Sequence, residues 1–354
     1  MAGDRMMEDG KRPARLTIRD IAARSGVSVA TVSRVLNGRP DVSNDTRESV
    51  LRLIREHGYA TNRNARGLAA GRTGLIGLTV PVVHAEYFNQ IVAGAAEALY
   101  ERDARFVLCP TQNEHDREVS LLERLMHGTT DGAILILPSE SGAELLRLRQ
   151  NGYPFVVVDP ETPVGDDIPV VAAAHWAGAK TATDYLIGLG HRHIAAITGP
   201  THWVASSERL SGYRSALSGA GLPIIESLIR ESDFRREGGY RAGREVLVHA
   251  PRPTAVFCFN DHMAVGALRA AWELCLAVPG DLSIIGFDDV QLASAVSPRL
   301  TTIRQPLQEM GSVAVSQLYR LLDGQMIETA HVHLSTRIVV RESTAPPSDH
   351  KTLR

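Results

Sequence analysis

The sequence predicts a small all-α domain at the N-terminus, followed by a larger α/β core with doubly wound parallel sheets in two lobes. The first 60 residues hold three short segments whose apolar residues have helical spacing and whose ends carry capping residues. From Gly74 onward, short runs rich in Val and Ile alternate with helical segments, a pattern typical of parallel sheets covered by helices. A chain of 354 residues is also too long for a single ordinary core.

Composition excludes a membrane-inserted protein. Apolar residues make up 44% of the chain and charged residues 22%, and no stretch approaches the roughly 18 apolar residues that a membrane span needs. The first 17 residues mix both charge signs without an apolar core, so no secretory signal is expected and a cytoplasmic location is predicted. No CxxC spacing occurs, and we expect buried free thiols, with no disulfide, metal site or cofactor, at Cys109, Cys258 and Cys275.

The N-terminal segment predicts three helices with marked ends. Thr17 is a candidate N-cap with Asp20 three residues later, and Gly26 ends this first helix. The second helix opens at Ser28 after a turn of about three residues, and the third follows a cap at Ser43. Helical spacing predicts a shared core of Val32, Val35, Leu36, Val50, Leu51, Ile54 and Tyr59.

Charge is distributed unevenly along the chain. Residues 1–73 hold 14 Lys and Arg against 8 Asp and Glu, a net charge of +6, whereas the remainder holds 24 against 32, a net charge of −8. A basic head on an acidic body suggests that the head meets a polyanion.

The join between the two parts is rich in Asn, Arg and Gly. Within "TNRNARGLAAGRTG", Leu68 is the single large apolar residue, and Gly67 costs about 1 kcal/mol relative to Ala inside a helix. We therefore expect a linker that is only marginally helical.

The core divides into two lobes at a boundary near residue 172, after the predicted strand "IPVVAA". The predicted organisation is a tail at 1–15, the all-α domain at 16–61, the linker at 62–73, the core at 74–345 and a tail at 346–354. The first lobe is expected at about 74–171 and 306–332, and the second at about 172–305 and 333–345.

Several motifs together resemble the lactose-repressor (LacI/GalR) family of bacterial transcription regulators. They are "TIRDIAARSGVSVATVSRVLNGRPDVSNDTRESVLRLIREHGY", "ARGLAAGRTGLIGL", "GLGHRHIAAITGP", "ERLSGYRSAL", "PTAVFCFNDHMAVGAL", "VPGDLSIIGFDDV" and "LTTIRQPLQEMG", and they run in order from about Leu16 to Glu342. The resemblance implies a helix-turn-helix DNA-binding domain, a hinge helix, and a core like the periplasmic sugar-binding proteins. It also implies a homodimer or tetramer that binds a palindromic double-stranded operator.

The second helix has the composition of a recognition helix. Its leading side chains are small, which lets the backbone approach base edges in the major groove, and Arg34 can donate two hydrogen bonds to guanine O6 and N7. In the family, the positions of Val29, Ala30 and Arg34 contact bases. We expect further, phosphate-directed contacts from Thr17, Ser28, Thr31, Ser33 and Asn37, and a DNA contact from Asn62.

The resemblance also places a minor-groove wedge in the linker. Leu68 corresponds to the hinge leucine of the family, which inserts between base steps and kinks the site. The family usually has Pro near position 61 and Ser or Ala near 67, where this chain has Thr61 and Gly67. Both departures predict a hinge that costs more free energy to order on DNA.

Polar side chains follow several predicted strands of the core, where ligands bind in doubly wound sheets. Asp159, Asn260 with Asp261, and Asp288 with Asp289 end three of these strands, and Arg209 opens "RLSGY". Such side chains around one cleft suit a hydroxyl-rich sugar. The resemblance matches Arg209, Asn260 and Asp288 to sugar-contacting positions and adds Tyr87, Phe88 and Phe234; weaker candidates are His84, Trp203 and Gln305.

One position departs from the family pattern. Many members have Asp-Asn at the start of the first helix of the second lobe, where this chain has Ala174 and His175. A ligand contact at that position is therefore not predicted.

These observations predict a sequence-specific repressor of sugar uptake or catabolism genes, with a small carbohydrate-like effector bound between the lobes. The alternatives are an activator or corepressor-dependent regulator with a non-sugar effector and, more remotely, a solute-binding protein. An enzyme is not expected, because the chain lacks GxSxG and P-loop motifs and because adjacent strand-end residues such as Asp288 and Asp289 point in opposite directions.

Overall fold

The structure is a computed structural model that describes residues 16–36, 39–57, 72–327 and 330–348. The chain forms two compact units, residues 1–73 and residues 74–354, which are described separately below. The predicted tail at 1–15, nearly all of the predicted linker and the candidate DNA contacts Asn37, Asn62 and Leu68 lie outside the described residues.

The first unit contains the three predicted helices, α1 (Ile18–Ser25), α2 (Val29–Leu36) and α3 (Asn44–Glu56). Thr17 caps α1 in a capping box with Asp20, and Gly26 ends the helix with a φ of 67°, which glycine adopts without steric cost. Ser43 caps α3. The capping residues predicted from the sequence are therefore confirmed.

A small apolar core holds these three helices together. Ile21, Val32, Val35 and Val50 are buried, and Leu36, Leu51 and Ile54 pack around them. The guanidinium of Arg24 on α1 also contacts the imidazole of His57 after α3 at 2.8 Å. Because one side of α2 packs into this core, the opposite side of the helix faces solvent.

The first lobe of the core is built on a six-stranded parallel sheet with strand order β11-β5-β4-β3-β1-β2. In chain order the strands are β1 (Leu75–Val80), β2 (Arg105–Pro110), β3 (Gly132–Ile136), β4 (Phe155–Val158), β5 (Val170–Ala173) and β11 (His331–Leu334). The central strands are buried on both faces, which accounts for their continuous apolar runs.

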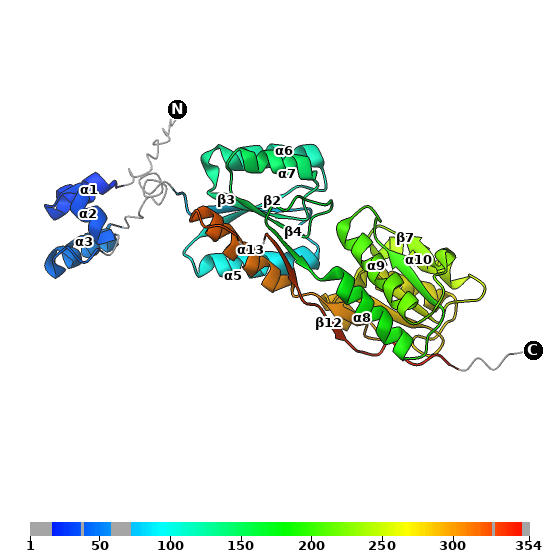
Figure 1. Cartoon of the computed structure of the whole chain (residues 1–354). Coiled ribbons are helices and arrows are strands. Elements are labelled where there is room, and N and C mark those ends of the chain that lie inside the picture. Colours follow the sequence, from blue (N-terminus) through cyan, green and yellow to red (C-terminus); the bar gives the residue numbers. More distant parts are fainter. Residues whose placement is uncertain (1–15, 37–38, 58–71, 328–329, 349–354) are drawn as a thin grey trace, which may run out of the picture. The chain divides into compact units, whose positions relative to one another are not determined.

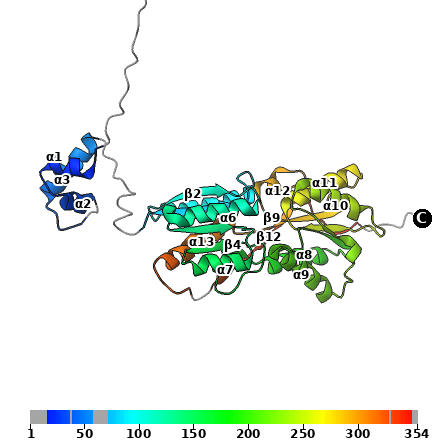
Figure 2. The ribbon, with the colours of Figure 1, turned by 90° about the horizontal axis from the view of Figure 1, so that it is seen from above.

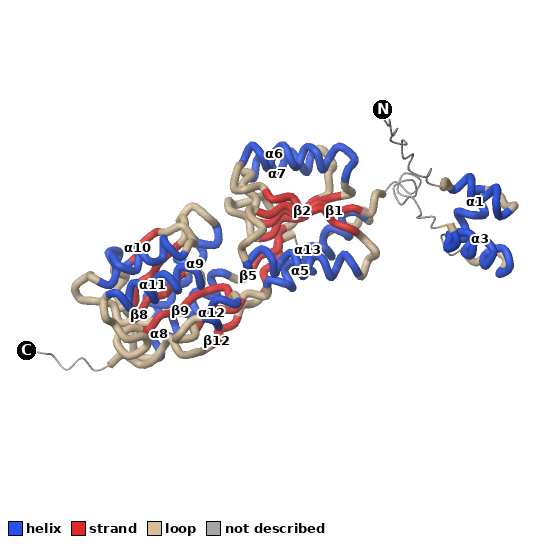
Figure 3. The backbone as a smooth tube through the Cα atoms, turned by 180° about the vertical axis from the view of Figure 1, so that it is seen from behind, coloured by secondary structure: helices blue, strands red, loops and turns tan. Residues whose placement is uncertain are grey.

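Helices cover both faces of this first sheet, as Figures 1 and 3 show. One face carries α5 (Glu86–Tyr100) and α13 (Leu307–Leu322), and the other carries α6 (His115–Arg124) and α7 (Gly142–Gln150), with the π-helix η1 (Leu125–Thr129) after α6. A Cβ on Gly94 would lie 1.9 Å from the backbone oxygen of Gln308, so glycine is required where α5 meets α13.

The second lobe is built on a sheet with strand order β12-β10-β9-β8-β6-β7. The strands are β6 (Ile194–Thr198), β7 (Ile229–Glu231), β8 (Ala255–Cys258), β9 (Ser283–Asp288), β10 (Thr301–Arg304) and β12 (Arg337–Val339). All pairs are parallel except that of β12 with β10 at the edge, which is antiparallel. The predicted parallel sheet thus gains one antiparallel edge strand.

The helices of the second lobe also form two layers (Figure 2). One layer is α8 (His175–Gly188) with α9 (Val204–Gly219), and the other is α10 (Arg236–Leu247) with α11 (Asp261–Glu273). The short elements η2 (Glu226–Leu228) and α12 (Gln291–Ala295) lie in the connections. As in the first lobe, the carboxyl ends of the strands carry the polar residues that the sequence singled out.

Two predictions need correction. The predicted lobe boundaries at 171/172 and 332/333 fall inside β5 and β11. These two strands pair with each other along their whole length in the first sheet, so the chain leaves the first lobe only after Ala173 and again after Leu334. Cys275, predicted to be buried, is exposed at the end of α11, whereas Cys109 and Cys258 are buried free thiols.

No helix among the described residues is long and apolar enough to span a membrane.

Candidate functional site

In the first unit, α2 presents one face to solvent. Val29, Ala30 and Arg34 are exposed, whereas Val32 and Val35 point into the core. Val29 is 40% exposed. The three residues predicted to contact base edges therefore share the outer side of α2.

Among the described residues of this unit, Arg34 has no buried partner. Its Nε lies 3.6 Å from the Asp41 carboxylate, and both side chains are more than half exposed. The hydroxyl of Ser28 accepts a hydrogen bond from the backbone N–H of Thr31 at 3.0 Å and caps α2, as that of Thr17 caps α1. The hydroxyls of Ser28 and Thr17 are therefore structural caps whether or not they also meet phosphates.

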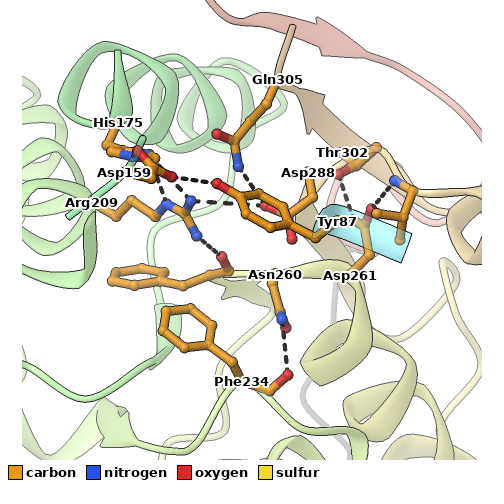
Figure 4. A network of polar contacts seen from close by, with 12 residues as sticks. Tyr87, Asp159, His175, Arg209, Phe234, Asn260, Asp261, Asp288, Thr302 and Gln305 are labelled. Atoms are coloured by element: carbon orange, nitrogen blue, oxygen red, sulfur yellow. Dashed lines mark hydrogen bonds and ion pairs between the residues drawn. The ribbon is translucent and has the colours of Figure 1, made fainter. Parts of the chain in front are cut away.

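In the second unit, polar side chains from both lobes converge in one cluster (Figure 4). Tyr87 comes from α5 and Asp159 from the end of β4, both in the first lobe. His175 on α8, Arg209 on α9 and Asp288 at the end of β9 come from the second lobe. We call these five residues and Gln305, which follows β10, the interlobe cluster.

Asp159 joins the two lobes. Its Oδ1 accepts a hydrogen bond from Nε2 of His175 at 2.8 Å across the lobe boundary, and its Oδ2 accepts one from the hydroxyl of Tyr87. Burial opposes ionisation of this carboxyl, but His175, Tyr87 and Arg209 outweigh burial and lower its pKa. Asp159 is therefore an anion at neutral pH, and burial together with this anion raises the pKa of Tyr87.

Arg209 is buried at 3% exposure, and its guanidinium is surrounded by acceptors. Nη1 donates to the carbonyl oxygen of Phe259, and Nη2 and Nε lie 3.2 and 3.4 Å from Nδ1 of His175. A guanidinium cannot accept hydrogen bonds, so Nδ1 of His175 is the acceptor and its Nε2–H is the donor to Asp159. The guanidinium also stacks on the ring of Phe287, with 3.9 Å between its central carbon and the ring centroid.

Asp288 closes the cluster on the second lobe. Its Oδ1 accepts a hydrogen bond from Nε2 of Gln305 at 2.6 Å and lies 3.8 Å from Nη2 of Arg209. Burial raises the pKa of this carboxyl to about 7, although Arg209 and Gln305 oppose the shift. Asp288 has a φ of 108°, a strained conformation for a residue other than glycine and one that is concentrated at functional sites.

Aromatic rings flank Arg209 on the second lobe. The ring centroid of Phe234 lies 5.6 Å from that of Trp203 and 6.0 Å from the guanidinium carbon of Arg209. Asn260 positions Phe234, because its Nδ2 donates to the Phe234 carbonyl oxygen at 2.9 Å while its Oδ1 caps α11. The predicted candidates Phe234, Asn260 and Trp203 are thus neighbours of the cluster.

Other predicted candidates have different surroundings. Both carboxylate oxygens of Asp261 accept hydrogen bonds within the second lobe, from Thr302 at 2.6 Å and from the backbone N–H of Val290 at 3.0 Å. Phe88 packs on the apolar core of the first lobe, and His84 is exposed. Asp289 turns away from Asp288 to pair with Arg304 and Arg341, so the two adjacent carboxylates do not face one substrate.

The sequence did not predict His175, which lies at the centre of the cluster with 1% exposure. The departure from the family motif at this position argued against a ligand contact. A positional signal was nevertheless present, because His175 begins the helix that follows β5, and β5 pairs with β4, whose end carries Asp159.

A cavity of about 320 Å³ reaches the cluster at Asp159 and His175, with walls that include Val204, Glu208 and His333. A second cavity of about 530 Å³ shares His175, Glu208 and His333 with it. Volumes in this range suit a small organic ligand. Among the described residues, no group of His, Cys, Asp or Glu side chains is arranged to hold a metal ion.

Comparison with protein-family models gives two matches. Residues 17–62 match the model described as "Bacterial regulatory proteins, lacI family", and residues 183–344 match a periplasmic binding protein-like domain.

Similar curated proteins span nearly the whole chain. The HTH-type transcriptional repressor PurR of Proteus mirabilis is 36% identical over 332 residues, which cover 93% of this chain and 97% of that protein. Catabolite control protein A of Priestia megaterium is 33% identical over 330 residues, covering 93% of this chain and 99% of that protein.

Solved structures give the same result. The Lac repressor dimer bound to operator and the anti-inducer ONPF matches with a TM-score of 0.84 at 29% identity, covering 93% of this chain and 99% of that one. A complex of the transcriptional regulator CelR with cellobiose matches with a TM-score of 0.72 at 35% identity, covering 93% of this chain and 100% of that one.

Proposed function

The chain belongs to the lacI family of bacterial regulatory proteins. We propose that it is a repressor of sugar uptake or catabolism genes, and that a small carbohydrate-like effector lowers or raises its affinity for its operator. Its helix-turn-helix unit binds operator DNA, and its two-lobed core binds the effector. The observation that carries the proposal is the interlobe cluster, in which a buried arginine and two carboxylates from both lobes meet.

The exposed face of α2 would read the operator. Arg34 is free of the core and can donate two hydrogen bonds to guanine, while Val29 and Ala30 are small enough to let the helix enter the major groove. A homodimer, the assembly of the operator-bound Lac repressor that this chain resembles, would place two such helices on the half-sites of a palindromic operator.

The effector would bind at the interlobe cluster. Carboxylates and an arginine beside the aromatic rings of Phe234 and Trp203 provide the acceptors, donors and stacking surface that a sugar requires. The CelR complex with cellobiose is a structure of a similar chain with such a ligand.

Effector and operator would be coupled through the angle between the lobes. The contacts between lobes include Asp159 with His175, the Val204 N–H with the Glu161 carbonyl at 2.9 Å, and the Gln291 N–H with the Glu86 carboxylate at 2.5 Å. A ligand that exchanges its own hydrogen bonds for these contacts shifts the population between two lobe arrangements. In a dimer this changes whether both DNA-binding units engage the operator at once.

Two experiments test the proposal. The protein is incubated with a random pool of double-stranded DNA, and we expect a palindromic sequence to be enriched; the absence of any enriched sequence would reject operator binding. Affinity for the enriched DNA is then measured with and without candidate sugars. Weaker binding identifies an inducer and tighter binding a corepressor.

A further inference from the structure

The interlobe cluster also indicates the charge class of the effector. We infer that the effector is an uncharged molecule that donates hydrogen bonds to Gln305 and Asp288, and that its phosphorylated or carboxylated counterparts are excluded. This inference rests on the function proposed above.

The first observation is an unused acceptor at Gln305. This side chain is 3% exposed, and its Oε1 is buried without a hydrogen bond from any described residue. The amide takes this orientation because its Nε2 donates to Oδ1 of Asp288 at 2.6 Å, where an oxygen would face a carboxylate whenever Asp288 is ionised. A buried amide oxygen without a donor costs about 1 to 3 kcal/mol, so a ligand that donates to it gains affinity.

The second unused acceptor belongs to Asp288. Oδ1 is shared between Gln305 and Arg209, whereas Oδ2 accepts no hydrogen bond from the described residues. Oε1 of Gln305 and Oδ2 of Asp288 belong to side chains joined by one hydrogen bond, so both free acceptors lie at this end of the cluster. Separate hydroxyl groups of one polyol, or the N–H groups of a neutral heterocycle, can satisfy the two acceptors.

Much of the cation that an anionic ligand would need is engaged within the protein. Each of the three nitrogen atoms of Arg209 contacts a protein acceptor, either the Phe259 carbonyl oxygen or Nδ1 of His175, so only one further N–H group on each of Nη1 and Nη2 is left for a ligand. His175 can supply no donor either, since its Nε2–H is bonded to Asp159. Sites that bind phosphate or carboxylate instead offer a free bidentate guanidinium or free backbone N–H groups.

The charges around the cluster point the same way. Two carboxyl groups, those of Asp159 and Asp288, face a single arginine, Arg209. A phosphate or carboxylate placed here would meet at least one uncompensated carboxylate in a buried site, and a like-charge contact of this kind costs several kcal/mol. An uncharged donor meets no such penalty.

The test compares ligands in pairs that differ only in a charged group. Glucose and ribose are measured beside glucose 6-phosphate and ribose 5-phosphate, and a purine nucleoside is measured beside its 5′-monophosphate. Binding to the full-length protein is followed by thermal shift and by calorimetry. We expect at least one neutral member to bind and its anionic partner to bind roughly 100-fold or more weakly.

A matched pair of variants locates the contact. Gln305→Leu removes the free acceptor in the cluster, and Gln317→Leu removes a similarly buried amide with an unpartnered Oε1 on α13 in the first lobe. We expect Gln305→Leu to weaken the neutral ligand roughly tenfold, and Gln317→Leu to leave its affinity unchanged. Operator binding by each variant shows that it is folded.

The outcomes separate this inference from the proposed function. An anionic ligand that binds as tightly as its neutral partner overturns the inference, as does unchanged affinity in Gln305→Leu. A panel in which no neutral member binds, while palindromic DNA is still enriched, also counts against the inference and leaves operator recognition standing. Failure to enrich any DNA sequence rejects the proposed function itself.

Discussion

The substitution Arg34→Ala should remove sequence discrimination without unfolding the DNA-binding unit. Arg34 contributes nothing to the core of Ile21, Val32, Val35 and Val50, and its exposed pair with Asp41 is worth at most about 1 kcal/mol. A lost bidentate contact with guanine costs about 1 to 3 kcal/mol for each half-site. At about 1.4 kcal/mol per tenfold change, each half-site loses roughly a factor of 5 to 150 in operator affinity.

The assay is fluorescence anisotropy on the enriched operator and on random DNA of equal length, at one fixed salt concentration. Arg52→Ala is the matched control, because Arg52 on α3 is also exposed and, within the described part of the chain, pairs only with Glu56 at 4.0 Å. The control should lower both affinities by a similar factor, whereas Arg34→Ala should lower the operator affinity far more. An operator-to-random ratio that survives Arg34→Ala would refute the assignment of α2 as the recognition helix.

Three further predictions concern the core. Arg209→Ala should keep operator binding but lose the effector response. Arg209→Lys keeps the positive charge but lacks the planar guanidinium group, so it should lose the response as well. An intact response in both variants would show that the effector binds elsewhere. Burial raises the pKa of Asp288 to about 7, and a donating ligand favours the ionised form, so effector affinity should rise between pH 6 and 8; Asp288→Asn should flatten this profile, and a flat wild-type profile would contradict it. Burial and the neighbouring Glu118 raise the pKa of Glu140 to about 8. Between the ordinary pKa of 4.5 and pH 8, the folded state therefore keeps a proton that the unfolded state releases. The free energy of unfolding should fall as pH rises through this range. Glu140→Gln should remove roughly 3 to 5 kcal/mol of that decline in urea titrations at pH 5 and 8, and parallel profiles for the two proteins would refute the assignment.

Local signals in the sequence were sufficient for the helices of the DNA-binding unit and most strands of the core. Thr17, Gly26 and Ser43 mark helix ends through their own backbone geometry, which depends on neighbours within four residues. The apolar runs of β3 and β4 predict buried strands because both faces of the sheet are covered.

The short strands β7, β11 and β12 could not be predicted in this way. They have three or four residues each, and they lie at the edges of the two sheets. Each is stabilised by pairing with a strand that is distant in the sequence. The lobe boundaries depend on β11, which pairs with β5 about 160 residues earlier, and this explains why they were placed two residues too early.

The site was predictable in its polar strand ends but not in their partners. The sequence singled out Asp159, Arg209 and Asp288, which the structure brings into one cluster, and it discounted His175, which joins them. Asp261 was also singled out, and its oxygens accept hydrogen bonds within the second lobe. Which way a strand-end carboxylate turns depends on donors from other elements, such as the Thr302 hydroxyl that holds Asp261 inside the second lobe. Such pairings arise from the tertiary structure and leave no local pattern.

The most direct test of the whole account is the operator affinity of the wild-type protein with and without a saturating concentration of the ligand that the paired panel identifies. Coupling between the interlobe cluster and the DNA-binding unit predicts a change of roughly 5- to 150-fold, corresponding to about 1 to 3 kcal/mol, and the same factor in ligand affinity when operator is added first. An operator affinity that does not change when the ligand saturates the core would contradict the account.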